Sequence, residues 1–405
     1  KPNSIAVFNA NDIYPISADS TLPFEQHRDL FYLTGVDQEE TILVLCPDAK
    51  DPKQREMVFV RETNAHIAVW EGHKLTKSEA TAVTGIDNVQ WTADFEASFL
   101  ELAKRVGNIY INTNEHYRAK VETQTREDRF IAWCKEQFPK KNYEKSNFIL
   151  QGLRGVKDPE EIAHIQQACD ITEKGFKRVL GFVTPGVWEF EIEAEFAHEF
   201  LRNRSKGFAY TPIIASGANS NVLHYIENSQ QCQAGELILM DVGAEYGNYS
   251  SDMTRTIPVS GRFTPRQRAV YEAVLKVKDE ATQLLMPGVL WKAYHVEVGK
   301  LMSSALVDVG LLTKKEVSDN AEAYKKYFMH GTSHHLGLDT HDYGLLDEPM
   351  EANMVFTVEP GIYIPDEGFG IRLEDDVVVQ ATGAPVNLMA NIPIDPDEIE
   401  ALMQS

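Results

Sequence analysis

The sequence predicts an α/β (α+β) protein with two domains, a mixed α/β domain over residues 1–150 and a second domain over residues 151–405. Three observations support this prediction. The 405 residues exceed what one hydrophobic core normally serves. Short β-rich runs alternate with helical stretches in the first part of the chain, and glycine, proline and unusual polar residues concentrate in the second.

The first domain shows strands and helices in turn. Runs rich in β-branched and aromatic residues predict strands at 41–45, 57–60 and 109–111, and apolar spacing predicts a helix over 94–106. This alternation is typical of an α/β domain.

The second domain begins with a helix signal. Asp158, Pro159 and Glu161 fit the N-cap, first-turn and capping-box positions of a helix. Further helices are expected near 188–202 and 264–285, followed or separated by strands that carry acidic residues.

The charge excludes some functions. A formal net charge of −22 and a pI near 5.0 argue against a nucleic-acid partner, because phosphate binding needs clustered Lys and Arg. No apolar run approaches the roughly 20 residues that span a bilayer, so we expect no membrane partner.

The four cysteines are far apart and form no Cys-x-x-Cys pair, which predicts reduced, buried thiols. Reduced thiols favour the cytoplasm. The chain begins at Lys1 rather than at Met, so the question whether a natural segment precedes it stays open.

Two aspartates follow a buried strand. Gly243 and Gly247 lie between Asp241 and Asp252 and suggest a β-hairpin that brings the two carboxylates together. Carboxylates at close range repel unless a proton or a cation lies between them. The alternative is a capped turn with a surface pair between Asp252 and Arg255.

A histidine cluster follows in MHGTSHHLGLDTHD, which holds His330, His334, His335 and His341. Imidazole supplies metal ligands and proton donors near neutral pH, so the group indicates a site. Solvent exposure in a loop stays an alternative for His335 and for His341.

Two further carboxylates interrupt strand-like sequence. Glu359 follows a β-branched and aromatic run, and Glu374 stands in a similar one. An unpaired buried Glu is costly, so each needs a cation, a proton or donors. Arg372 is the alternative partner of Glu374.

Four carboxylates and one histidine together predict a centre with two divalent cations. Asp241, Asp252, Glu359 and Glu374 balance the charge of two such ions, and His334 completes the set. A donor set rich in oxygen with one imidazole favours Mn²⁺, with Co²⁺, Zn²⁺ or Fe²⁺ as alternatives.

The motifs HYIEN at His224, DVGAEYGNYSSDMTRT, MHGTSHHLGLDTHD, VEPGIY and GIRLEDD occur in this order. With them the chain resembles the pita-bread metallopeptidases of family M24B, and within these the Xaa-Pro aminopeptidases (aminopeptidase P). Residues 28–35 and 153–162 share the resemblance. It implies an aminopeptidase P-type domain over 1–150 and a pita-bread catalytic domain over 151–405.

The resemblance also implies roles for the site residues. Asp241, Asp252, His334, Glu359 and Glu374 would be the metal ligands. Glu359, with His224 and His341, would be catalytic, Glu359 handling the proton for the leaving nitrogen. His224, His330, His341 and Arg372 would bind substrate. Trp70 lies where the family has an aromatic that reaches a neighbouring subunit, and ordinary core or surface packing is its alternative.

The implied activity is hydrolysis of the N-terminal Xaa-Pro bond of peptides by a hydroxide held between two metals, in a homodimer or homotetramer. The first domain argues against a methionine aminopeptidase. A prolidase, which accepts only Xaa-Pro dipeptides, is the nearest alternative, although the short link from the histidine motif to Glu359 favours the aminopeptidase. A non-catalytic peptide-binding relative is a further alternative.

Overall fold

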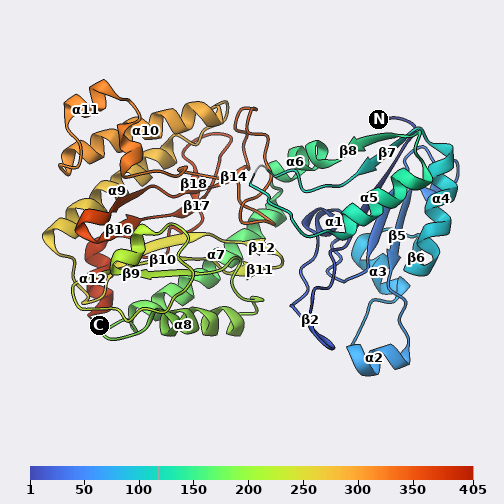
Figure 1. Cartoon of the computed structure of the whole chain (residues 1–405), viewed down its shortest axis with the longest axis horizontal. Coiled ribbons are helices and arrows are strands. Elements are labelled where there is room, and N and C mark those ends of the chain that lie inside the picture. Colours follow the sequence, from blue (N-terminus) through green and yellow to red (C-terminus); the bar gives the residue numbers. More distant parts are fainter. Residues whose placement is uncertain (117, 405) are drawn as a thin grey trace. The chain divides into compact units, whose positions relative to one another are not determined.

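The computed structural model describes residues 1–116 and 118–404, and the chain divides into two compact units, Lys1–Gln151 and Gly152–Ser405 (Figure 1). The elements of the first unit are β1 Ser4–Asn9, β2 Pro15–Ser17, β3 Ser20–Thr21, α1 Arg28–Thr34, β4 Ile42–Leu45, η1 Pro52–Gln54, β5 Glu56–Val60, α2 Ala65–Glu71, α3 Lys77–Thr84, β6 Val89–Trp91, η2 Thr92–Asp94, α4 Phe95–Arg105, β7 Asn108–Ile111, α5 Arg126–Gln137 and β8 Asn142–Lys145. Helix α6, Asn147–Gly155, contains the division between the units.

The first unit is built on a mixed six-stranded sheet in the order β6-β5-β4-β1-β7-β8. Strand β4 pairs antiparallel with both β1 and β5, whereas β1-β7, β7-β8 and β5-β6 are parallel. Successive side chains of a strand point to opposite faces, so Ile42 and Val44 pack with Phe99 and Phe130 of α4 and α5, while Leu43 packs with Leu30 of α1. Helices therefore cover both faces of the sheet.

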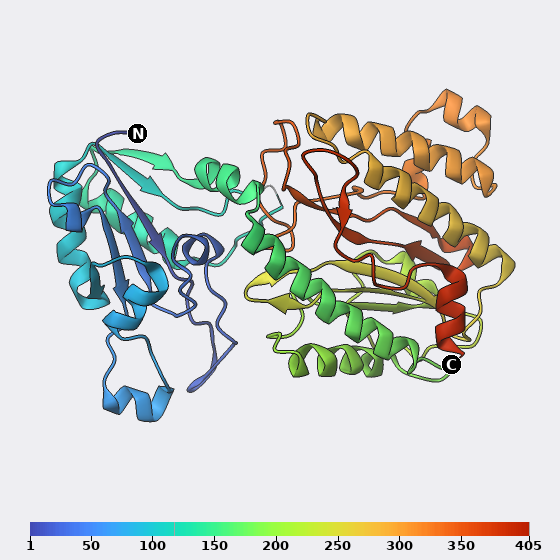
Figure 2. The ribbon, with the colours of Figure 1, turned by 180° about the vertical axis from the view of Figure 1, so that it is seen from behind.

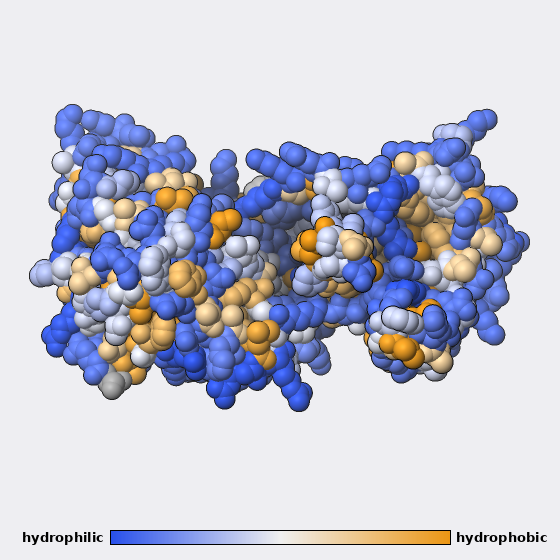
Figure 3. Space-filling view, turned by 60° about the horizontal axis from the view of Figure 1, so that its bottom comes forward, coloured by the Kyte–Doolittle hydropathy of each residue, from blue (hydrophilic) through white to orange (hydrophobic). Residues whose placement is uncertain are grey.

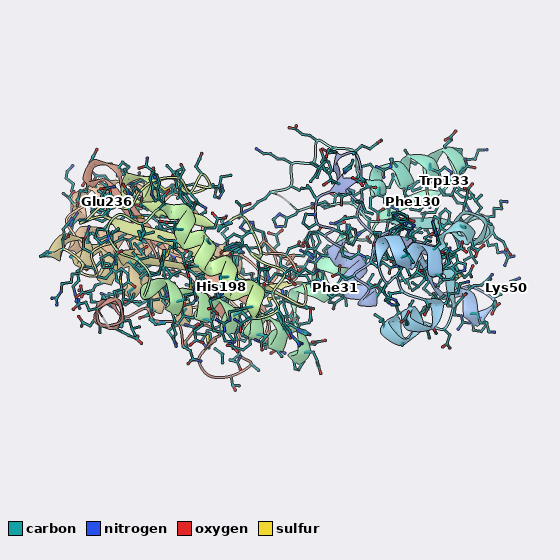
Figure 4. The ribbon with its side chains drawn as sticks, turned by 90° about the horizontal axis from the view of Figure 1, so that it is seen from below. Phe31, Lys50, Phe130, Trp133, His198 and Glu236 are labelled. Atoms are coloured by element: carbon teal, nitrogen blue, oxygen red, sulfur yellow. The ribbon has the colours of Figure 1, made fainter. Side chains whose placement is uncertain are left out.

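The predicted elements of this unit are confirmed within two residues. Strands β4, β5 and β7 occupy the three predicted positions, and α4 begins after Asp94 as expected. Figure 4 labels Phe130 and Trp133 on α5, whose ring centroids lie 6.1 Å apart in the aromatic core beside α4. The sequence class α/β is therefore correct for this unit.

The second unit contains α7 Pro159–Leu180, α8 Glu189–Arg202, β9 Ile213–Ser216, η3 Gly217–Asn221, β10 Leu237–Val242, β11 Glu245–Tyr246, β12 Tyr249–Ser250, β13 Met253–Pro258, α9 Pro265–Gln283, α10 Trp291–Asp308, α11 Lys314–Asp319, η4 Ala323–Lys326, β14 Val355–Val358, β15 Gly361–Ile364, η5 Pro365–Glu367, β16 Phe369–Arg372, β17 Asp375–Val378, β18 Val386–Asn387 and α12 Pro396–Met403. Helix α7 packs against α8, and α9 packs against α10. Figures 1 and 2 show the strands between these two helix pairs.

The strands of the second unit form short antiparallel sheets, β13-β10-β9, β14-β17-β18 and β15-β16. Strand β13 also meets the segment that joins β16 to β17. The backbone N–H of Glu374 donates to the carbonyl of Thr254 at 3.0 Å, and the hydroxyl of Thr256 donates to the carbonyl of Arg372 at 3.0 Å. Carboxylates from distant parts of the sequence therefore come to one place.

The predicted helix after residue 157 is confirmed. Asp158 caps α7, its side chain accepting from the backbone N–H of Glu161 at 2.8 Å while the Glu161 carboxylate accepts from the N–H of Asp158 at 2.9 Å. Pro159 occupies the first turn. Helices α8 and α9 likewise lie within the predicted ranges.

All four cysteines are buried free thiols, as predicted. Burial raises the pKa of Cys134 and of Cys232 to about 12. Among the described residues, no helix is both long and apolar enough to cross a membrane. The face seen in Figure 3 is mostly hydrophilic with scattered apolar patches, which suits the strong net charge.

Candidate metal centre and active site

Asp241 and Asp252 lie at the two ends of the predicted hairpin. Strands β10 and β13 pair antiparallel with Asp241 opposite Thr254, and between them β11 and β12 form a small hairpin. Its two-residue turn, Gly247 and Asn248, has positive φ at both positions, the requirement of a type I′ turn. The hairpin is therefore confirmed.

The surface-pair alternative for Asp252 is wrong. Asp252 is buried, and Arg255 is fully buried and pairs with Asp375 at 2.7 Å instead. The residue that follows Asp241 and Val242 must be glycine, because a Cβ on Gly243 would lie 1.8 Å from the carbonyl oxygen of Ser251. Close backbone approach at this glycine brings the two halves of the hairpin together.

The hydroxyl of Tyr210 joins the two aspartates. It lies 2.6 Å from Oδ1 of Asp241 and 2.5 Å from Oδ1 of Asp252. One hydroxyl proton can serve only one carboxylate at a time. The two carboxylates therefore lie close together and compete for the proton of Tyr210.

His334 faces these carboxylates with one ring nitrogen. Its Nδ1 lies 2.9 Å from the carbonyl oxygen of His335, which can only accept, so Nδ1 carries the proton. Nε2 is then the acceptor atom of the neutral ring, and it lies 3.4 Å from Asp252 and 3.6 Å from Glu359. This is the tautomer that a metal ligand requires.

Glu359 directly follows β14, and its backbone N–H donates to the carbonyl of Thr332 at 2.7 Å. Its carboxylate lies between two imidazoles, with Oε1 3.6 Å from His334 and Oε2 3.6 Å from His330. Glu359 thus connects the His334 side of the site with the His330 side.

Glu374 lies between β16 and β17 and is buried. It accepts from the hydroxyl of Thr254 at 2.6 Å. Ligand atoms of Asp252, His334 and Glu374 all lie within 4.8 Å of one another, close enough to hold one ion.

The electrostatics of the cluster fit a cation. Burial, followed by the charge of Asp241, raises the pKa of Asp252 well above its usual range, and burial with the charge of Asp252 does the same for Glu374. Burial also raises the pKa of Glu359 to about 7. Buried carboxylates that repel one another in this way need a proton or a metal ion between them.

Among the described residues, Arg372 is the arginine that pairs with this cluster. Its guanidinium donates to Asp241 at 2.5 Å, to the Tyr363 hydroxyl at 2.8 Å and to the Thr254 hydroxyl at 3.0 Å. Its close carboxylate partner is thus Asp241, rather than Glu374 as the alternative interpretation had it. One arginine leaves most of the negative charge of the four carboxylates unbalanced.

Tyr363 extends the contacts to His330. Its buried hydroxyl lies 2.7 Å from Nε2 of His330, whose Nδ1 lies 2.8 Å from the carbonyl oxygen of Gly331. Burial raises the pKa of Tyr363 to about 12, so this hydroxyl keeps its proton at neutral pH. His330 therefore lies in the same network as Arg372.

The other two histidines of the motif, His335 and His341, have different surroundings. The exposed His341 lies against His334, with ring centroids 4.3 Å apart. His335 is buried between Trp291 and Phe356, with centroids 6.0 Å and 4.4 Å away, and burial lowers its pKa to about 3. The solvent-exposed alternative is wrong for His335, which is a core residue.

His224 lies on an exposed segment between η3 and β10. Its buried neighbour Tyr225 belongs to the same hydrophobic cluster as Tyr363. The cluster connects the His224 segment with the tyrosine that contacts His330 and Arg372.

Three residues that contact the predicted site residues were not predicted from the sequence, namely Tyr363, Thr254 and Tyr210. Tyr363 stands within VEPGIY and Thr254 within the hairpin motif, so both motifs contained a signal that residue type alone did not reveal. Tyr210 lies 31 residues before Asp241, outside the quoted motifs, and only the fold connects them.

Comparisons with known proteins identify the family of the chain. The sequence profile of metallopeptidase family M24 matches residues 163–381, and that of the aminopeptidase P N-terminal domain matches residues 1–110. The chain is 34% identical to an Xaa-Pro aminopeptidase of Escherichia coli over 419 residues, covering 100% of this chain and 94% of the relative. It is 30% identical to human Xaa-Pro aminopeptidase 3, covering 97% and 79%.

Solved structures show the same likeness. A zinc-substituted aminopeptidase P of E. coli in complex with product superposes with a TM-score of 0.89 at 33% identity, covering 100% of this chain and 94% of that one. The N-terminal mixed α/β domain followed by the pita-bread domain is therefore the fold of this protein. The chain belongs to metallopeptidase family M24, among the Xaa-Pro aminopeptidases.

Proposed function

We propose that this chain is a metal-dependent aminopeptidase that hydrolyses the bond between the first residue of a peptide and a proline at position two. The observation that carries the proposal is the convergence of Asp252, His334 and Glu374, with Glu359 beside them, in a chain that matches Xaa-Pro aminopeptidases along its whole length. The prolidase alternative is not favoured, because relatives in E. coli and human that this chain matches over 97% or more of its length are named Xaa-Pro aminopeptidases.

Five side chains are proposed to hold two divalent cations, namely Asp241, Asp252, His334, Glu359 and Glu374. The donor set fits such ions, since buried carboxylates of raised pKa surround one neutral imidazole whose Nε2 is an acceptor. When bound, a pair of divalent cations generates a nucleophile from water at neutral pH and polarises the scissile carbonyl.

Glu359, His224 and His341 are proposed to act on the reacting peptide. Glu359 touches both His330 and His334, a position from which a carboxylate can carry a proton between the reacting centre and the leaving group. His341 is exposed beside His334, and His224 is exposed on its own segment, so a substrate can reach both side chains.

Proline sets a special demand on the leaving group. The bond before proline is a tertiary amide without N–H, so its nitrogen must be protonated before it can depart as an amine. We propose His224, His330, His341 and Arg372 as the substrate-binding residues. Arg372 and His330 share the Tyr363 hydroxyl, which holds both side chains in place.

We also propose Mn²⁺ as the native metal, the cytoplasm as the location, and a homodimer or homotetramer. Hard oxygen donors support Mn²⁺, and four free buried thiols support a reducing compartment. Trp70 on α2 is 77% exposed, so it does not pack in the core. An exposed Trp supports contact with another copy, and surface packing beside His66, whose ring centroid lies 6.4 Å away, stays the alternative. Residues 1–150 and 151–405 are proposed as the two domains.

The test compares three substrates after chelation and addition of Mn²⁺, Co²⁺ or Zn²⁺. We expect cleavage of an Xaa-Pro-Pro peptide, much slower cleavage of its Xaa-Ala-Pro counterpart, and loss of both after chelation. Activity confined to the Xaa-Pro dipeptide would contradict the proposal in favour of a prolidase. Metal binding without any cleavage would contradict it in favour of a peptide-binding protein.

A second measurement does not depend on turnover. Adding Mn²⁺ to the metal-free protein should raise its melting temperature, since a ligand at 100 times its Kd stabilises the folded state by about 2.7 kcal/mol. Asp252→Asn should reduce the shift, and Glu322→Gln, an exposed glutamate beside Lys325, should not. Equal shifts in all three proteins would place the metal elsewhere.

A further inference from the structure

Glu189 is a fully buried carboxylate that takes no part in the proposed chemistry. It is the first residue of α8, where a carboxylate suits the helix N-terminus, yet its side chain accepts from groups outside the helix. A buried carboxylate is costly unless donors surround it. Its partners therefore indicate what the residue is for.

The donors of Glu189 come from the segment that carries His224. One oxygen accepts from the backbone N–H and the hydroxyl of Ser216, each at 2.7 Å, where the segment begins. The other accepts from the Tyr225 hydroxyl at 2.8 Å, in its middle, and from the backbone N–H of Gln230 at 2.8 Å, at its end. One carboxylate thus ties the entry, the middle and the exit of residues 216–230.

Every one of these partners is a donor, and a carboxylate can only accept. An amide in the same place would turn its own NH₂ group toward donors on one side. Glutamine is almost the same size as glutamate, so the chemistry of the contacts, rather than the space, selects an acid here.

The same helix holds the segment at a second point. The side chain of Asn228 donates to Glu193 of α8 at 2.8 Å and to the carbonyl of Pro212 at 3.0 Å, while its oxygen accepts from the N–H of Ile214 at 2.9 Å. Asn228 has φ of 45°, a left-handed conformation that Asn tolerates well. His224 is therefore an exposed side chain on a segment whose backbone is anchored from both sides.

We infer that Glu189 is a positioning residue, which holds the 216–230 segment so that His224 reaches the substrate in one fixed orientation. This inference rests on the proposed function of His224. It assigns α8 a role in substrate recognition, although α8 supplies no residue to the metal cluster. Because a small misplacement of a catalytic group lowers rates strongly, loosening this segment should weaken turnover without removing metal.

The main variant is Glu189→Gln, and Glu191→Gln is its matched control. Glu191 belongs to the same turn of α8 and accepts from the backbone N–H of Trp188 at 2.8 Å, so its loss weakens the helix cap only. We expect Glu189→Gln to lower kcat/KM for Xaa-Pro-Pro by about 10- to 100-fold with unchanged metal content. Glu191→Gln should change it less than about 2-fold after correction for folded protein.

A double-mutant cycle separates positioning from general damage. If Glu189 acts through His224, Glu189→Gln should have little further effect in a His224→Ala background. Independent, multiplicative losses would overturn the inference. Tyr225→Phe removes the middle tie and leaves those at Ser216 and Gln230, so it should give a smaller loss of the same kind.

Hydrogen exchange tests the anchor without any substrate. Amides of residues 216–230 should exchange faster in Glu189→Gln than in wild type or Glu191→Gln, while those of β10 stay unchanged. Unchanged exchange in the segment would overturn the inference even if the enzyme is active. Faster exchange in a protein that cleaves no Xaa-Pro bond would instead show that the anchor exists and that the proposed function is wrong.

Discussion

Two neighbouring residues, Glu374 and Asp375, are both buried carboxylates and have opposite surroundings. Asp375 pairs with Arg255 at 2.7 Å and with Lys278. Burial alone would raise its pKa, but these two cations hold it below the usual range. Among the residues that the structure describes, Glu374 has only the Thr254 hydroxyl as a close donor, and burial, followed by the charge of Asp252, raises its pKa.

A second buried acid of the second unit, Asp342, resembles Asp375 in having two cationic partners. Asp342 is buried with Arg154 and with Lys157 at 3.1 Å, and although burial opposes them, the two cations lower its pKa. Where the chain supplies cations, as at Asp375 and Asp342, the acid forms ion pairs that connect distant segments of the chain. Around Asp252 and Glu374 the described residues supply neither two such cations nor the set of neutral donors that surrounds Glu189, so these acids are left for a cation from outside.

The largest expected effect comes from the site without its own cations. Glu374→Gln should lower kcat/KM by roughly three powers of ten or more, which corresponds to an activation barrier higher by about 4 kcal/mol. In the metal-free protein the same change removes repulsion, so the melting temperature should rise. Calorimetry with and without metal checks both signs, with Glu322→Gln as the control. A lower melting temperature of the metal-free variant would contradict this assignment of the acids.

The next largest effect is expected at Asp375, whose cations come from the chain itself. Arg255→Met leaves Asp375 buried with one cation fewer and should reduce the free energy of unfolding by about 3–5 kcal/mol. Urea unfolding measures the change. Arg262→Met, at an exposed arginine, should stay within about 0.5 kcal/mol. A loss at Arg255 no larger than that would show that Asp375 does not depend on its partners.

Glu127 in the first unit offers an intermediate case, because it is buried and accepts from the neutral backbone N–H of Asn9 at 2.9 Å. Burial raises its pKa from 4.5 to about 7. Between these values the folded state keeps the proton that the unfolded chain has lost, so stability falls as the pH rises through this window. The loss is at most about 3 kcal/mol.

Glu127→Gln should remove this part of the pH dependence. Melting temperatures from pH 4.5 to 8 for wild type and variant should converge at low pH and separate as the pH rises, with the variant more stable. An exposed glutamate of the same unit, as in Glu101→Gln, provides the control. Parallel curves for wild type and Glu127→Gln would refute the prediction.

The smallest effect belongs to an exposed pair. Lys315 and Asp319 lie one turn apart on α11 at 3.1 Å, and both are exposed. Because water screens such pairs, Lys315→Ala should cost about 0.5 kcal/mol or less in urea unfolding. A cost above about 1 kcal/mol would mean that burial does not explain why this pair is expected to stabilise the fold less than the buried pair of Arg255 and Asp375 does.

Local patterns explain which parts of this molecule could be predicted from sequence. The hairpin that carries Asp241 and Asp252 was predictable because the glycines that allow its turns lie between them. The start of α7 was predictable because its capping box is contiguous. Both depend on neighbours along the chain.

The surroundings of each acid could not be predicted in this way. Arg255 and Lys278 precede Asp375 by 120 and 97 residues, so no spacing reveals why Asp375 is paired and Glu374 is not. His335 beside His334 is a similar case, since only the packing of Trp291 and Phe356 makes it a core residue. Such assignments depend on contacts that the tertiary fold creates.

The buried cysteines have a practical consequence. Cys46 and Cys134 lie in the first unit, and Cys169 and Cys232 in the second. A thiol reacts as thiolate and only when a reagent can reach it, so each becomes modifiable when its own unit opens. Timed alkylation followed by mass spectrometry would therefore record opening of the two units separately. Metal should slow the modification of Cys169 and Cys232 and leave that of Cys46 and Cys134 unchanged.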